Sequence, residues 1–115
     1  MKNISTLEKT LGIRFKNKNI LIKSLTHKSY STNNNERLEF LGDRVVGLIL
    51  SRKLYDLYPN ESEGILDKRF SKLVNKKTFY EISKKIKLQN FLFLGQSYKG
   101  SQTVNKSIAS NACEA

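Results

Sequence analysis

The sequence predicts an all-α fold, and three observations support this prediction. Apolar residues recur at helical spacing in several separate segments. No stretch alternates apolar and polar residues as a half-buried strand does, and glycine, proline or polar clusters divide the helical segments. The 115 residues show no shift in composition that would mark a second domain. We therefore expect one domain, residues 1–115, large enough to bury a core.

The longest predicted helix begins near Glu36 and ends near Tyr58, because Pro59 disfavours helix in the residue before it. Five shorter segments are also expected to contain helix. These are 4–11, closed by Gly12; 19–24; a segment from 62 or 63 onward; 76–85; and 104–115. Two stretches between them are expected to be less regular: a short helix or extended corner over 89–96, and a flexible polar loop over 98–103.

The predicted long helix carries an apolar face and, beside it, an acidic stripe. The apolar face consists of Leu38, Leu41, Val45, Leu48 and Ile49. Other apolar residues continue on the acidic side, so the helix is apolar nearly all round, which predicts burial on more than one side. Glu36, Glu39 and Asp43 are spaced i, i+3 and i+7. Because three like charges this close repel one another, they indicate a divalent cation, and Mg²⁺ prefers carboxylates, waters and phosphate oxygens.

Structural capping is the second interpretation of the acidic stripe. Asn33 precedes Glu36 by three residues, as in a capping box, and acids in a first turn favour the helix dipole. Capping extends at most to Glu39. It does not explain Asp43, which lies too far into the helix, nor Gly42, which costs about 1 kcal/mol relative to alanine in a helix interior. Spacing alone leaves both interpretations open.

The formal net charge of +11 favours a polyanionic partner, either nucleic acid or an acidic membrane surface. A chain this rich in lysine, asparagine and isoleucine can also reflect an adenine- and thymine-rich genome. Lys68, Arg69 and Lys72 alternate with apolar positions and lie on the solvated face of their predicted helix. They are either an ordinary soluble surface or a track for RNA phosphates.

The cysteine count and the start of the chain bear on the compartment of the protein, and the lone histidine bears on its chemistry. Cys113 is the only cysteine, so no internal disulfide can form, and we expect a reducing compartment. The start of the chain lacks the apolar run of a signal peptide and no segment approaches a membrane span, so a cytoplasmic protein without membrane contact is expected. His27 is the lone histidine and is expected to be a hydrogen-bonded structural residue.

Residues 36–43, Glu-Arg-Leu-Glu-Phe-Leu-Gly-Asp, resemble the signature of the bacterial-type ribonuclease III family. Further stretches agree in the same order: 25–30, 58–64, 93–95, 107–109 and 112–115. The resemblance extends from about Ile4 to Ala115. It implies the all-α ribonuclease III catalytic-domain fold and a Mg²⁺-dependent endonuclease that cleaves double-stranded RNA. It also implies a homodimer whose two subunits form one RNA valley.

The resemblance also implies a Mg²⁺ site, in which Mn²⁺ can replace Mg²⁺, with Glu39, Asp43 and Glu114 as acidic ligands. Glu39 and Asp43 share one helix face and Asn111 and Glu114 share another, so two helices could surround the ion. Where the family carries aspartate, this sequence has Asn111. Its carbonyl oxygen can still bind a hard cation, but one negative charge is lost. We therefore expect weaker Mg²⁺ binding and lower turnover.

Asp43 and Glu114 are also expected to be catalytic residues, and the resemblance adds Glu36 and Glu63 as acids near the same cleft. These two would support cleavage or dimer geometry. Relatives commonly continue the last helix and add a double-stranded-RNA-binding domain, so a C-terminally truncated catalytic domain is expected.

Two alternatives to a nuclease stay open. One is a catalytically silent ribonuclease III-like module that binds RNA or a protein. Asn111 and the truncation favour this module, whereas Glu39, Asp43 and Glu114 oppose it. The other is a structural helical domain, which would require the eight-residue signature to be a coincidence.

Overall fold

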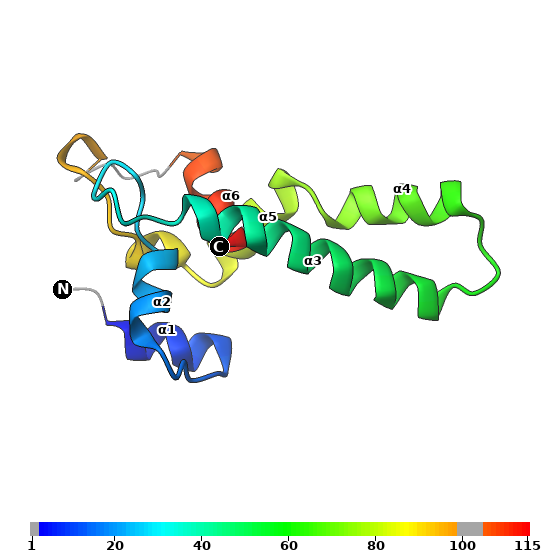
Figure 1. Ribbon diagram of the computed structural model, residues 1–115, viewed down its shortest axis with the longest axis horizontal. Helices are drawn as coiled ribbons and strands as arrows, with labels where there is room; N and C mark the ends of the chain where they lie inside the picture. The colour runs from blue at the N-terminus through cyan, green and yellow to red at the C-terminus, as the bar shows by residue number, and fades with distance from the viewer. Residues whose placement is uncertain (1–2, 99–104) are drawn as a thin grey trace.

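The helix α3 (Glu36–Leu57) is the long axis on which the other elements are arranged (Figure 1). This computed structural model describes residues 3–98 and 105–115, and within those ranges it contains helices and no strand. The other elements are α1 (Ile4–Leu11), α2 (Lys18–Ser24), α4 (Glu63–Leu73), α5 (Lys76–Lys85), η1 (Leu88–Phe91), η2 (Gln96–Tyr98) and α6 (Lys106–Glu114). The all-α prediction is confirmed, and the expected helix boundaries agree to within about two residues. Of the expected loop over 98–103, residues 99–103 lie outside the described residues, as does Val104.

The shape is elongated, 50 × 29 × 25 Å, because α3 and α4 form a hairpin that projects from the remaining helices (Figure 1). The hydrophobic core lies at the other end, among α1, α2, η1 and α6. Its buried members are Leu7, Leu21, Leu25, Leu88, Phe91, Leu92, Ile108 and Ala112. The projecting hairpin therefore has little core of its own. No helix in the described part of the chain is long and apolar enough to cross a membrane.

Side-chain caps explain where most of the helices begin. The Asn17 side chain accepts hydrogen bonds from two N–H groups of the first turn of α2, and Ser62 and Asn75 cap α4 and α5 in the same way. Gly12 closes α1 in the left-handed conformation at φ 72°. Ser62 and Asn75 each stand directly before a segment in which the sequence predicts a helix.

The start of α3 corrects the capping-box prediction. Asn35, not Asn33, occupies the cap position, and its side chain makes no capping hydrogen bond. Instead the buried Asn35 amide donates to the carbonyl oxygen of Ser24 at 3.1 Å and so ties α3 to the end of α2. The N–H of Glu36 is satisfied by the Asn34 side chain at 3.0 Å.

Most of the apolar face of α3 is exposed in a single chain, with Leu38 half-buried, so one chain alone does not supply the predicted burial. Leu54 is the one buried residue of this helix, whereas Leu41, Val45, Leu48 and Ile49 are between 46% and 72% exposed. The reason is geometric: the core forms beside the first turns of α3, and beyond them α4 covers part of the helix.

Backbone hydrogen bonds join the segment after α2 to the segment after η1. The N–H of Phe93 donates to the Leu25 carbonyl at 2.9 Å, and the N–H of His27 donates to the Phe93 carbonyl at 3.0 Å. The His27 ring shares a hydrogen bond with Ser29 Oγ at 2.7 Å, and partial burial lowers the pKa of the ring. This agrees with a structural role for His27.

Candidate nuclease site

The first half of α3, the start of α5 and the end of α6 enclose an open cleft of about 480 Å³. Four carboxylates and two cations line it: Glu36, Glu39, Asp43 and Glu114, with Arg44 and Lys76. Three of the acids come from successive turns of α3, as the spacing predicted. Glu114 comes from the last residue of α6. The structure thus brings Glu114 to the acids of α3, although it lies 71 or more residues after them in the sequence.

Electrostatic effects in this cleft disfavour the charged forms of two acids. Burial raises the pKa of Glu39, and the neighbouring carboxylates of Glu36 and Asp43 raise it further. Burial also raises the pKa of Glu114, with Asp43 and Glu39 acting in the same direction. The Lys76 ammonium opposes both shifts. A bound cation would therefore be favourable here, because it would offset charges that repel one another.

Asn111 belongs to α6, and its side chain approaches Glu39 of α3. Its amide is assigned from the groups around it: the terminal atom that faces Glu39 Oε1 and the Ser107 carbonyl oxygen, 3.2 Å from each, is taken as the nitrogen, because both neighbours are acceptors. In this conformation the nitrogen, rather than the oxygen expected of a metal ligand, faces Glu39. The amide here fixes a carboxylate by donating a hydrogen bond, which an aspartate could not do when ionised.

Asp43 is held by its own neighbour in sequence. Arg44 Nη1 lies 2.6 Å from Asp43 Oδ2, and the Arg44 guanidinium carbon lies 4.4 Å from the centroid of the Phe40 ring. Both charged side chains are substantially exposed.

No three side chains of the metal-ligating types converge on one point in the part of the chain that is described. The donor set nevertheless suits a hard cation, because it consists of carboxylate oxygens along one open cleft. Glu39, Asp43 and Glu114 are the residues that would hold such an ion.

Glu63 is not brought to this cleft within one chain. It begins α4 at the far end of the projecting hairpin and lines a different hollow with Tyr55 and Phe70. Its predicted catalytic role stays a prediction.

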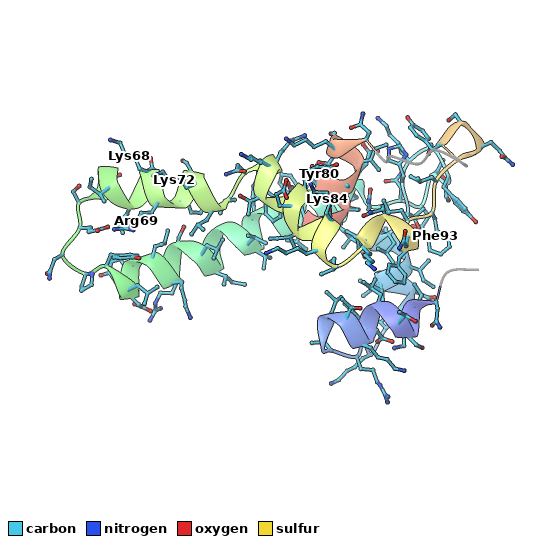
Figure 2. All side chains as sticks on the ribbon, turned by 180° about the vertical axis from the view of Figure 1, so that it is seen from behind. Lys68, Arg69, Lys72, Tyr80, Lys84 and Phe93 are labelled. Carbon is cyan, nitrogen blue, oxygen red and sulfur yellow. The ribbon has the colours of Figure 1, made fainter. Side chains whose placement is uncertain are left out.

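Of the three basic residues of α4 that were candidates for an RNA track, one is bound to a neighbouring carboxylate. Figure 2 shows Lys68, Arg69 and Lys72 on this helix. Arg69 is already engaged: its Nε and Nη2 donate to the two carboxylate oxygens of Glu61, each at 2.6 Å, and its guanidinium lies 3.8 Å from the Tyr58 ring centroid. Lys68 and Lys72 are exposed. Because Arg69 is bound to Glu61 and lies over Tyr58, it joins α4 to the turn that precedes this helix.

Sequence reasoning missed the cleft residues contributed by the start of α5. Lys76 directly follows the cap residue Asn75, and Phe79 lies one turn further on. The lysines of this region can be seen in the sequence. The sequence does not show that α5 begins against the end of α6, because this contact depends on packing between distant segments.

Comparisons with known proteins identify the family to which this chain belongs. The Ribonuclease-III-like family model matches residues 17–115. Ribonuclease 3 of Pelagibacter ubique is 58% identical over 89 residues, which make up 76% of this chain and 40% of that protein. Ribonuclease 3 of Wolinella succinogenes is 44% identical over the whole of this chain and 49% of its own length. The chain thus spans about half the length of the curated relatives it matches, or less.

A solved structure of the nuclease domain of ribonuclease III from Campylobacter jejuni superposes with a TM-score of 0.92 and is 40% identical. The match covers 97% of this chain and 80% of that one. A second structure of the Campylobacter jejuni domain gives a TM-score of 0.90 at 41% identity. The present chain therefore belongs to the ribonuclease III-like family, and its fold is that of a ribonuclease III nuclease domain.

Proposed function

We propose that this chain is the nuclease domain of a cytoplasmic ribonuclease III that cleaves double-stranded RNA and depends on Mg²⁺. The observation that carries the proposal is the cleft in which Glu39 and Asp43 of α3 lie with Glu114 of α6. Oxygen donors of this kind suit Mg²⁺, which keeps several waters and accepts phosphate oxygens. When bound, Mg²⁺ would supply a Lewis acid that activates water and stabilises charge on the phosphodiester.

The protein's own groups have separate tasks in this proposal. Glu39, Asp43 and Glu114 would hold the cation, and Asn111 would keep the Glu39 carboxylate in place by donating a hydrogen bond to it. Lys76 and Arg44 are the cations of the cleft wall and limit the repulsion between the acids and a polyanionic substrate.

A homodimer is part of the proposal. The exposed apolar residues of α3 form a stripe that solvent would not favour in a lone chain. One Campylobacter jejuni structure is described as flexible in a region involved in dimer formation of that protein's nuclease domain. A twofold pairing of two chains through α3 would cover the stripe.

A catalytically silent module is the second candidate, and Asn111 is the observation that favours it. Replacing a carboxylate by an amide removes one negative charge from the cation site, which weakens affinity for a hard ion.

The decisive experiment is cleavage of a plain RNA duplex with Mg²⁺, with Mn²⁺ and with EDTA. Cleavage should require the metal and should be lost in Asp43→Asn and Glu39→Gln. Asp56→Asn is the matched control, because it removes a carboxylate from the same helix where Asp56 makes only an exposed ion pair with Arg52 at 3.0 Å. Duplex binding without cleavage at any metal concentration would select the silent module instead.

A further inference from the structure

Three exposed lysines and one tyrosine form a basic edge where α5 packs beside α6; we call it the α5–α6 edge. Its members are Lys76, Tyr80, Lys84 and Lys106. Lys76 Nζ donates to Ser107 Oγ at 3.3 Å. The ammonium groups of Lys84 and Lys106 lie 4.9 and 5.7 Å from the centroid of the Tyr80 ring. Two lysines from different helices thus share one aromatic ring.

Lys76 joins this edge to the acidic cleft. It lines the cleft together with Glu39 and Glu114, and its charge acts on both. Its one hydrogen bond within the described residues goes to an uncharged hydroxyl, whereas an ammonium has three donors. Arg44, the other cation of the cleft, is already paired with Asp43. Lys76 is therefore the cleft cation with donors to spare.

The outer part of the edge is also open to a ligand. Lys84 pairs with Glu81 at 3.4 Å, but both side chains are about half exposed, and such surface pairs contribute little. The Tyr80 ring attracts both ammonium groups and limits where they can move. Both ammonium groups are thus held beside one ring, and the only ion pair between them and the described residues is the exposed one of Lys84 with Glu81.

The edge differs from the α4 surface that the sequence offered as a candidate RNA track. Figure 2 shows Tyr80 and Lys84 on α5 beside α6, whereas Lys68 and Lys72 lie along α4 in the projecting hairpin. On α4, Arg69 is neutralised by Glu61. The row of lysines that leads to Glu39 and Glu114 therefore lies along α5 and the start of α6.

Resting on the proposed function, we propose that the α5–α6 edge guides the phosphate backbone of the RNA into the acidic cleft. In this arrangement Lys76 holds the phosphate next to Glu39 and Glu114, and Lys84 and Lys106 hold phosphates further out. Phosphates follow one another closely along each strand of a nucleic acid, so a row of lysines can contact several in turn. Contacts of this kind position the duplex without reading its sequence.

The test is duplex RNA affinity measured across a salt series in EDTA, where binding is separated from metal-dependent cleavage. The edge variant Lys84→Gln/Lys106→Gln should weaken binding and reduce the log–log salt slope by about two. Its matched control is Lys77→Gln/Lys85→Gln, which removes the same charge from residues that line a separate hollow of α5. The control should change the slope by much less.

Lys76 is tested separately. Lys76→Gln should reduce the slope by about one and raise KM for duplex cleavage several-fold, with a smaller effect on kcat, while Lys76→Arg should restore most of the loss. Thermal melting of each variant should match the parent, because the side chains are exposed.

Three outcomes would contradict either the RNA contact at the α5–α6 edge or the proposed nuclease function. Equal slopes for the edge and control pairs would overturn the edge, because binding would then respond only to net charge. An unchanged RNA affinity in Lys76→Gln, combined with a lower Mg²⁺ requirement, would also overturn it, because Lys76 would merely offset the acids. If the parent chain binds duplex RNA but never cleaves it, the proposed nuclease function fails. The binding series would still decide the edge.

Discussion

Gly42 lies directly against the backbone of Glu114. A Cβ added to Gly42 would come 1.8 Å from the Glu114 carbonyl oxygen and 2.9 Å from its carbonyl carbon. The end of α6 therefore touches α3 where α3 has no side chain, between Glu39 and Asp43. This explains why a helix tolerates glycine in its interior: the close approach brings the acid of α6 to the acids of α3.

Gly42→Ala should lower the free energy of unfolding by about 1–3 kcal/mol, the usual cost of overpacking. The clash is with backbone atoms, so α6 must move, and cleavage should fall even where the domain still folds. Gly47→Ala is the matched control in the same helix, because its Cβ would lie 3.7 Å from Phe70 Cζ, an ordinary contact. The control should gain up to about 1 kcal/mol from helix propensity. Melting temperatures that rise equally in both variants would show that α6 does not depend on the glycine.

Asn111→Asp should make the metal-free protein less stable and the Mg²⁺-bound protein relatively more stable. Without metal, the new carboxylate replaces a donor that lies 3.2 Å from Glu39 Oε1 and instead repels that acid. With Mg²⁺, the added charge should tighten binding, and each tenfold gain in affinity adds about 1.4 kcal/mol of stabilisation at saturating ion. Thermal melting across a Mg²⁺ titration measures both effects, and cleavage at low Mg²⁺ should rise.

The control for that prediction is Asn60→Asp, which makes the same charge change at an exposed position in the turn between α3 and α4. Its Mg²⁺-dependent shift should equal that of the parent. If Asn111→Asp shifts no more than this control, Asn111 does not limit the affinity for the ion.

Glu8 should contribute stability that depends on pH. Its carboxylate accepts hydrogen bonds from Lys18 Nζ and, at 2.6 Å, from the N–H of Phe15, and these partners lower its pKa. Because the folded-state pKa is lowered, the contribution is fully present above the unfolded value of about 4.5 and is lost as the pH falls through the folded-state pKa. Glu8→Gln should thus melt at a lower temperature than the parent at pH 7, and the gap should narrow as the pH falls below the unfolded-state value. A gap of constant size would indicate packing rather than charge.

Local chemistry made the helices predictable from sequence, and distant packing limited the prediction of the site. Ser62 and Asn75 stand directly before apolar periods and cap the helices that were expected there. The acids of α3 were visible because their spacing lies within one helix. The start of α3 was misjudged, with Asn33 expected as the cap, because Asn35 is fixed by a hydrogen bond to Ser24 in another helix. Lys76 was overlooked because its position in the cleft arises only when α5 packs against α6.

Leu48→Glu should convert a dimer into a monomer without unfolding the chain. Leu48 is 72% exposed in a single chain, so a charge there costs the monomer little, whereas in a pairing through α3 it would be buried and unpaired. Sedimentation at micromolar concentration should show about twice the chain mass of 13.2 kDa for the parent and that mass for the variant. Ile13→Glu, which alters a 54% exposed side chain in the turn after α1, should leave the mass of the parent unchanged. A parent that sediments as a monomer, or a Leu48→Glu variant that stays dimeric, would show that the stripe on α3 is not the subunit interface.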